Sequence, residues 1–155
     1  MDYPVEDYKP VKVLKKGGKS LQVTLMQNNK GDKIIKKQYD KNIDTHRDSF
    51  EKEIRILDKL KSYKYVPKLL SVDKKNYTFY ETYCGVIVPS NSGGFSNAEQ
   101  KMIERTKDLY NKYGLAYIKD GKQEWFVHRL NYCLLNGKIY MIDFGSIKWQ
   151  ENYKQ

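Results

Sequence analysis

The sequence predicts an α+β domain built on an antiparallel sheet, and three observations support this prediction. Short runs of alternating apolar and polar residues, typical of strands, are separated by clusters of Gly, Asn and Asp that are typical of turns. Two longer segments carry apolar residues at helical spacing. Of the 155 residues, 39% are hydrophobic and 31% are charged, which is the balance of a globular protein. A chain of this length is expected to form one domain.

The first half of the chain predicts five strands and one helix. Gly17-Gly18 and Asn28-Asn29-Lys30-Gly31-Asp32 separate the first three strands, and the second of these segments is a hairpin signal. Asp48-Ser49-Phe50-Glu51 resembles a capping box, and apolar residues follow it at helical spacing. His46, in the polar stretch before that helix, is expected at the surface. The expected elements are strands over Val11–Leu14, Leu21–Met26 and Lys33–Lys37, a helix over Ser49–Ser62, and strands over Val66–Val72 and Tyr77–Tyr83.

The second half predicts a helix followed by short strands. Ser96-Asn97-Ala98-Glu99 is typical of a helix start, and Gly114 suits the C-terminal cap of the same helix. Asn136-Gly137 predicts a two-residue hairpin turn. The residues that share the apolar face of the helix are Ala98, Met102, Thr106, Leu109 and Tyr113. The expected strands cover Leu115–Ile118, Trp125–Val127, Asn131–Leu135 and Ile139–Ile142.

Composition and charge exclude several classes of protein. No run approaches the roughly 18 apolar residues that span a bilayer, and the N-terminus lacks the basic and apolar regions of a signal peptide. We therefore expect a cytoplasmic protein without membrane insertion, located inside the host cell if the chain is viral or a bacterial effector. Cys84 and Cys133 lie in apolar runs and match no metal-ligand spacing, which favours reduced thiols. The formal charge of +10 favours acidic partners, but dispersed lysines and the absence of a nucleic-acid motif disfavour nucleic acid.

Three charged residues in a fixed order point to phosphate chemistry. Lys36 lies in the strand Ile34-Ile35-Lys36-Lys37, and Glu53 lies in the helix that follows. Asp143 ends a late alternating strand and begins Asp143-Phe144-Gly145. A carboxylate in that position is suited to hold Mg²⁺ against nucleotide phosphates. Lys37 is the alternative to Lys36, because a shift of one residue in strand register exchanges which lysine points inward.

This set of motifs resembles the protein kinase-like superfamily. Ile34–Lys37 is similar to its V-A-I-K strand, Phe50–Leu57 to its F-x-x-E-I-x-x-L helix, and Asp143–Gly145 to its D-F-G element. The resemblance is nearest to reduced, atypical members of the RIO type or lipopolysaccharide-kinase type, including minimal versions in bacterial effectors and viruses. It implies a kinase-like fold with a five-stranded antiparallel N-lobe sheet and one helix over about residues 8–84, and a truncated C-lobe over about 85–155.

The resemblance also implies cofactors and a set of binding residues. The cofactors are ATP and Mg²⁺ or Mn²⁺. Lys36 would hold the phosphates and Glu53 would orient Lys36, whereas Asn131 and Asp143 would ligate the metal. The other residues expected to contact the nucleotide are Gly18, Lys19 and Val23 of the glycine-rich turn, together with Glu81 and Tyr83 of the hinge.

The catalytic loop departs from the family pattern. One alignment matches Asn131 to the metal-binding Asn of the family and His128 to the Lys or His of its catalytic loop. In this alignment, Phe126 occupies the position of the catalytic Asp. A phenyl ring cannot accept the proton of a substrate hydroxyl or orient that hydroxyl. A second alignment, which requires a longer loop, places Asp120 in the position of the catalytic Asp. Asp120 is therefore the expected replacement, and Glu124 is a further candidate.

Two functions follow from the resemblance. The first is an ATP-dependent atypical kinase that transfers the γ-phosphate of ATP to a Ser or Thr hydroxyl of an unidentified protein substrate. The alternative is a pseudokinase that binds nucleotide or docks a partner protein without phosphotransfer. Phe126 favours the alternative, and so does the short segment after Gly145, which leaves little surface for positioning a peptide.

Overall fold

The computed structural model describes residues 3–88, 95–125 and 129–153, and its secondary structure is α+β as predicted. The chain divides into two compact units. The first consists of Met1–Lys61 and Pro67–Tyr83, and the second consists of Ser62–Val66 and Cys84–Gln155. Within the described ranges, neither helix has the length and apolar character that crossing a membrane requires.

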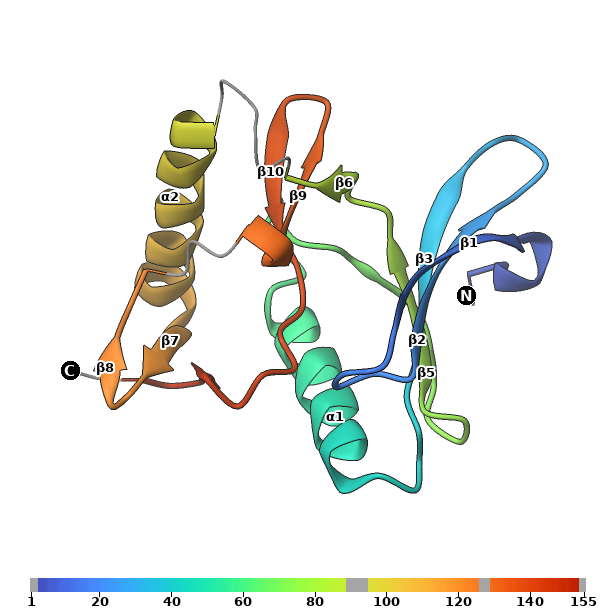
Figure 1. Cartoon of the computed structure of the whole chain (residues 1–155), viewed down its shortest axis with the longest axis horizontal. Helices are drawn as coiled ribbons and strands as arrows, with labels where there is room; N and C mark the ends of the chain where they lie inside the picture. The colour runs from blue at the N-terminus through green and yellow to red at the C-terminus, as the bar shows by residue number, and fades with distance from the viewer. Residues whose placement is uncertain (1–2, 89–94, 126–128, 154–155) are drawn as a thin grey trace. The chain divides into compact units, whose positions relative to one another are not determined.

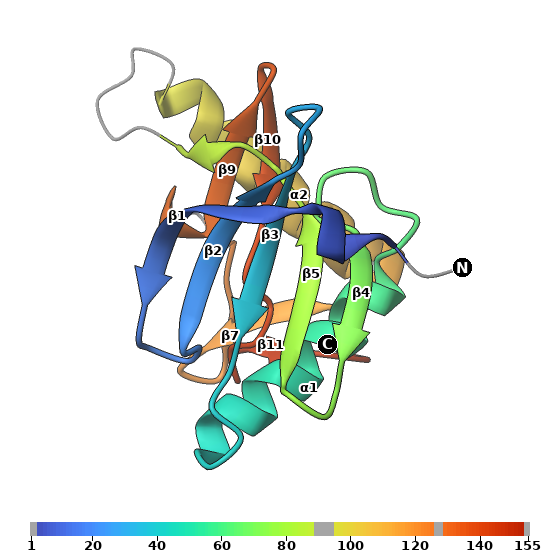
Figure 2. The same ribbon diagram turned by 90° about the vertical axis from the view of Figure 1, so that its right-hand side faces the viewer.

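The first unit contains the predicted five-stranded antiparallel sheet. Its strand order is β1-β2-β3-β5-β4, which can be followed across the sheet in Figure 2. A short 3-10 helix, η1 (Val5–Asp7), precedes the first strand. The strands are β1 (Lys9–Lys16), β2 (Gln22–Gln27), β3 (Lys33–Gln38), β4 (Leu69–Asp73) and β5 (Thr78–Thr82). The sequence located all five, although β4 begins three residues later than expected.

Side chains pack against both faces of this sheet, although β1 is exposed along its length. Helix α1 (Asp44–Lys59) packs against one face, as Figure 1 shows, and Phe50 of this helix is fully buried with ring contacts to Tyr39 and Phe79. The N-terminal segment lies against the other face, where Tyr8 packs with Met26 and Ile34. Burial of these apolar side chains supplies most of the energy that holds the layers together.

Helix α1 begins one turn earlier than the sequence predicted, and it also ends three residues earlier, at Lys59. The capping-box assignment at Asp48 was wrong, because the helix starts at Asp44 and the N-cap position carries Ile43, without a side-chain cap. The buried stripe extends into this first turn through His46, which is only 5% exposed. The expectation of a surface histidine was therefore also wrong. A polar residue at a helical core position is easily missed when only apolar spacing is counted.

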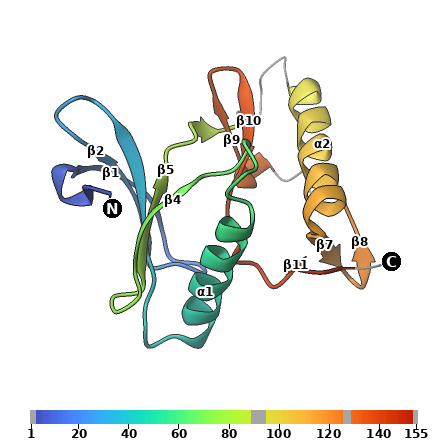
Figure 3. The same cartoon turned by 180° about the vertical axis from the view of Figure 1, so that it is seen from behind.

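The second unit combines one long helix with two three-stranded sheets. Helix α2 (Phe95–Tyr113) runs beside the β9–β10 hairpin, as Figure 3 shows from behind. Of the predicted apolar face, Met102, Thr106 and Leu109 are fully buried. The sheet orders are β10-β9-β6 and β11-β7-β8. The remaining elements are β6 (Val86–Ile87), β7 (Ala116–Lys119), β8 (Lys122–Gln123), the 3-10 helix η2 (Arg129–Asn131), β9 (Tyr132–Leu135), β10 (Lys138–Met141) and β11 (Trp149–Gln150).

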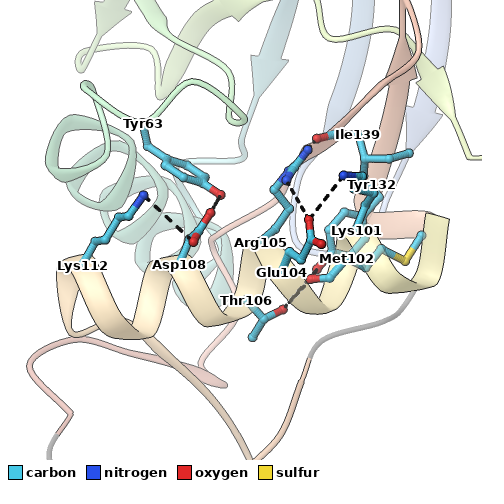
Figure 4. Close-up of polar contacts among 10 residues, drawn as sticks. All are labelled: Tyr63, Lys101, Met102, Glu104, Arg105, Thr106, Asp108, Lys112, Tyr132 and Ile139. Atoms are coloured by element: carbon cyan, nitrogen blue, oxygen red, sulfur yellow. Dashed lines mark hydrogen bonds and ion pairs between the residues drawn. The ribbon is translucent and has the colours of Figure 1, made fainter. Parts of the chain in front are cut away.

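Polar contacts along α2 fasten the short segment Ser62–Val66 within the second unit (Figure 4). The Tyr63 hydroxyl donates a hydrogen bond to Asp108 at 2.8 Å. Burial, and secondly this bond, raise the pKa of Tyr63. The guanidinium of Arg105 stacks 3.4 Å from the centre of the Tyr65 ring, and its Nε–H donates to the Ile139 carbonyl. Side chains of α2 therefore help to hold this segment in place.

Several turns and strands of the second unit test the sequence predictions. The Asn136-Gly137 hairpin turn is confirmed, with both residues at positive φ. Gly114 also has positive φ, and its N–H donates to the Tyr110 carbonyl as a helix C-cap. The strand expected over Trp125–Val127 is wrong at Trp125, which lies outside any strand, and the rest of that prediction falls outside the described residues. The sequence did not predict β6, β8 or β11, which contain only two residues each.

Gly85 provides a test of this fold. Its φ is +102°, and a Cβ atom built there would lie 2.0 Å from the Leu134 carbonyl oxygen, which is backbone. We expect Gly85→Ala to destabilise the second unit by more than about 3 kcal/mol, because strand β6 must move away from β9. Gly137→Ala is the matched control: it also has positive φ, but its Cβ would meet nothing within 4 Å, so about 1–2 kcal/mol is expected. Urea unfolding followed by circular dichroism measures both, and equal losses would contradict the β6–β9 packing.

Candidate functional site

A buried cluster of one ammonium and two carboxylates lies between the sheet and helix α1 of the first unit. The Lys37 Nζ is 2.6 Å from an oxygen of Glu53 and 3.2 Å from an oxygen of Glu81. The side chains of these three residues are 3–5% exposed. Strands β3 and β5 and helix α1 each contribute one member. The cluster therefore ties helix α1 to two central strands.

The lysine of this cluster is Lys37, and the prediction that Lys36 pairs with Glu53 was wrong. Alternation along β3 places Lys37 on the face that α1 covers, together with Tyr39, whose ring contacts Phe50. Lys36 points to the opposite face, where its Nζ lies 5.9 Å from the centre of the Tyr80 ring. The register alternative identified from the sequence is the observed one. What either lysine binds stays a prediction.

Glu81 takes part through its side chain, which the sequence did not predict. It was expected to contact the nucleotide as part of the hinge. Its carboxylate lies beside Lys37 because Glu81 and Lys37 occupy the same face of adjacent strands. If all three groups are ionised, one positive and two negative charges leave the cluster with a net charge of −1. Tyr83, the second expected hinge residue, is half-buried just beyond β5, and the Lys33 Nζ lies 5.3 Å from its ring centre.

The glycine-rich turn joins β1 to β2 in the same unit. Gly17 and Gly18 both have positive φ, and Lys19 next to them is exposed. Val23, in β2, pairs directly with Lys37 in β3, so its side chain lies on the same face of the sheet. The first unit thus carries the expected phosphate-turn residues and a buried lysine on neighbouring strands.

Asn131 and Asp143 lie together at one end of the β9–β10 hairpin in the second unit. Asn131 directly precedes β9, and Asp143 follows β10 by two residues. The N–H of Ile142 donates to the Asn131 carbonyl at 2.9 Å, which extends the hairpin by one pair. Both residues are half-buried. A carboxylate and a side-chain amide are oxygen ligands that Mg²⁺ accepts. Among the described residues, no group of three His, Cys, Asp or Glu side chains forms a metal site by itself.

Asp120 lies in a different hairpin of the second unit. It forms the turn between β7 and β8 with Gly121, and both turn residues have positive φ. The expectation of a longer loop that carries Asp120 was wrong, because a two-residue hairpin turn holds it in the sheet β11-β7-β8. Glu124 is exposed just after β8. Phe126 and His128, on which the reading of the catalytic loop depended, lie outside the described residues.

Comparison of the chain with models of known protein families gives no match, and comparison with curated proteins gives none. The geometry described above is therefore the basis for assigning a function.

Substitution of each lysine tests which one belongs to the cluster. Lys37→Met leaves two buried carboxylates without their ammonium, so we expect a loss of about 3–5 kcal/mol in the free energy of unfolding of the first unit. Lys36→Met removes only a half-exposed contact with Tyr80, and we expect less than about 1 kcal/mol. Urea titration of both variants gives the comparison. A larger loss for Lys36→Met would indicate that Lys36, and not Lys37, faces α1, and would contradict the register of β3.

Proposed function

We propose that this protein binds ATP together with Mg²⁺ or Mn²⁺, and that Lys37 binds the phosphates. The buried pair of Lys37 and Glu53 carries this proposal. The sequence resembles the protein kinase-like superfamily, in which a strand lysine that reaches the phosphates pairs with a glutamate of the following helix. Lys37 replaces Lys36 in the proposal because Lys37 is the lysine that pairs with Glu53.

The cost of burying these charges supports a role in binding. A buried ion pair adds little stability compared with apolar residues of similar size, because desolvation offsets most of the attraction. Lys37 and its two carboxylates lie beside a large aromatic core that also packs α1 against the sheet. A fixed ammonium, however, is well suited to bind a triphosphate, since its position is set before the ligand arrives. We infer that the cluster positions the Lys37 ammonium for an anion.

Asn131 and Asp143 are the residues that would hold the metal ion. Mg²⁺ usually keeps several waters and takes only one or two protein carboxylates, with substrate phosphates as further ligands. The Asp143 carboxylate and the Asn131 side-chain amide oxygen belong to residues at the same end of the hairpin, and they match this ligand requirement. When bound, such an ion neutralises charge on the phosphates. Asp143 has φ +66°, a conformation that Asp tolerates better than most residues do.

Transfer of the γ-phosphate to a protein Ser or Thr hydroxyl is the activity that the resemblance implies for this site. A pseudokinase is the second candidate, and the position of Asp120 favours it. The side chain proposed to orient the acceptor lies in a tight turn of a separate sheet from Asn131 and Asp143. In that case the protein would bind nucleotide and act by docking a partner, for which its charge of +10 favours an acidic surface.

ATP binding is tested by ligand-induced thermal stabilisation. With MgATP at about 100 times its dissociation constant, we expect about 2.7 kcal/mol of added stability in the wild-type protein. Lys37→Met should lose this gain, because the phosphates lose their cation, and Lys36→Met should keep it. Each variant is compared with its own ligand-free form, so that the lower stability of Lys37→Met does not enter the result.

Two comparisons decide how specific the binding is. Inorganic triphosphate reports general attraction of anions, and a single-stranded oligonucleotide reports nucleic-acid binding. Stabilisation by MgATP that exceeds both supports the proposal. Equal stabilisation by all three ligands, or none by MgATP, would contradict it.

Phosphotransfer is measured with γ-labelled ATP and an acidic, serine-rich acceptor protein such as casein. We expect incorporation of label by the wild-type protein and at least a 100-fold loss in Asp143→Asn, which removes the charge that would hold the metal. Asp120→Asn keeps a residue that tolerates positive φ, so a loss of transfer with unchanged ATP affinity assigns Asp120 to the acceptor. ATP binding without transfer identifies the protein as a pseudokinase.

A further inference from the structure

His46 joins two segments of the first unit through both of its ring nitrogens. Nδ1 lies 2.9 Å from the backbone nitrogen of Asp40, and Nε2 lies 3.1 Å from the Gly18 carbonyl oxygen. The Asp40 N–H is necessarily a donor, so Nδ1 accepts. Nε2 must then carry the proton and donate to Gly18. The two contacts fit the neutral imidazole in a single tautomer.

The carbonyl that His46 binds belongs to the glycine-rich turn. Gly17 and Gly18 lack side chains and have φ values of +83° and +80°. The other backbone bonds of this turn, from Gly17 to Leu21 and from Leu21 to Gln38, hold its ends. Because a peptide unit is planar and trans, fixing the Gly18 carbonyl toward His46 also points the Lys19 N–H to the opposite side. The His46 bond therefore sets the direction of a backbone donor in the turn.

His46 and Glu53 lie on the same buried face of α1. They are seven residues apart, which is about two helical turns or 10.5 Å along the axis. One helix thus fixes the Lys37 ammonium through Glu53 and the glycine-rich turn through His46. The proposed function assigns Lys37 to the phosphates, and the resemblance to the kinase-like superfamily implies that the glycine-rich turn contacts the nucleotide.

We propose that His46 is a positioning residue for phosphate binding. Its Nε2–H holds Gly17-Gly18-Lys19 in the conformation in which backbone N–H groups of the turn bind phosphate oxygens. This inference rests on the proposed binding of ATP. It adds a residue that no family motif supplies, because the contact depends on a histidine in the first turns of α1. A purely structural histidine would stabilise the unit without any preference for the phosphates of a ligand.

Two substitutions separate the bonds that His46 makes. The side-chain nitrogen of Gln can replace Nε2 as the donor to Gly18, and the side-chain oxygen of Asn can replace Nδ1 as the acceptor from Asp40. Each variant keeps one hydrogen bond and loses the other, so the two are matched in polarity. We expect His46→Asn to bind MgATP about tenfold more weakly than the wild-type protein and His46→Gln to rescue most of this loss.

The affinity for adenosine is the control for a general effect, since adenosine lacks phosphates. We expect adenosine to bind both variants like the wild-type protein. Isothermal titration provides the affinities, and ¹⁵N spectra of the imidazole, identified by their absence in His46→Gln, should show the neutral Nε2–H tautomer of His46.

The outcomes distinguish this inference from the proposed function. Equal ATP affinity in His46→Asn and His46→Gln overturns the positioning role while ATP binding stands, and so does a parallel loss of adenosine binding. An Nδ1–H tautomer for His46 also overturns it. Failure of the wild-type protein to bind ATP overturns the proposed function and this inference together.

Discussion

The contact between the Lys37 ammonium and the Glu53 carboxylate is the constraint on which the first unit is built. It fixes the register of β3, because a shift of one residue would move the lysine to the opposite face and bury Lys36 in its place. It also fixes the rotation of α1 about its axis. A helix rotated away from this position would leave Glu53 buried without its cation, which costs several kcal/mol. Apolar packing brings the layers together, whereas the ion pair selects one arrangement of them.

The rotation of α1 then determines what its other buried polar residues contact. With Glu53 on Lys37, the residue two turns earlier faces the β1–β2 turn, and that residue is His46. Phe50 lies between them and fills the space against Tyr39 and Phe79. Polar and aromatic contacts thus alternate along one helix face. The aromatic contacts contribute packing energy, and the polar contacts on either side fix the orientation of the helix. Hydrogen bonds can do this because they depend on geometry more steeply than apolar packing does.

The sequence predicted most of the fold because its local signals agree with the tertiary structure. Alternating residues and Gly or Asn turns located the five strands of the first sheet, and Asn136-Gly137 located the β9–β10 hairpin. The two-residue strands β6, β8 and β11 were missed because they are too short to show alternation. Strands β6 and β11 form only by pairing with strands that are distant in sequence, such as Trp149 with Tyr117. Local sequence patterns do not reveal such distant partners.

The candidate site was less predictable than the fold, for reasons that differ between residues. Ile34 and Ile35 are both apolar and both buried, so the alternation that would separate Lys36 from Lys37 is absent in the sequence. Tyr39, two residues after Lys37, was the available signal for the correct face. His46 was expected at the surface because polar residues are usually exposed, and Glu81 was assigned to the hinge by the family resemblance. Their burial depends on Lys37 and Gly18, and both of these partners come from other elements.

The turn at Asp143 shows how the second unit maintains a positive φ at its candidate metal site. A positive φ costs most residues other than Gly about 1–2 kcal/mol, and although Asp tolerates it better, the surrounding structure fixes this turn from both sides. Before Asp143, the backbone is bound through Met141 to Tyr65 and through Ile142 to Asn131.

After Asp143, the chain is fixed by Phe144, which is fully buried against Trp149. Trp149 is in turn fixed by the pairing of β11 with β7. The segment that follows Asp143-Phe144-Gly145 therefore acts as the second support of this turn. The two-residue strand β11, which the sequence did not predict, thus helps to hold in place Asp143, which the resemblance predicts as a metal ligand.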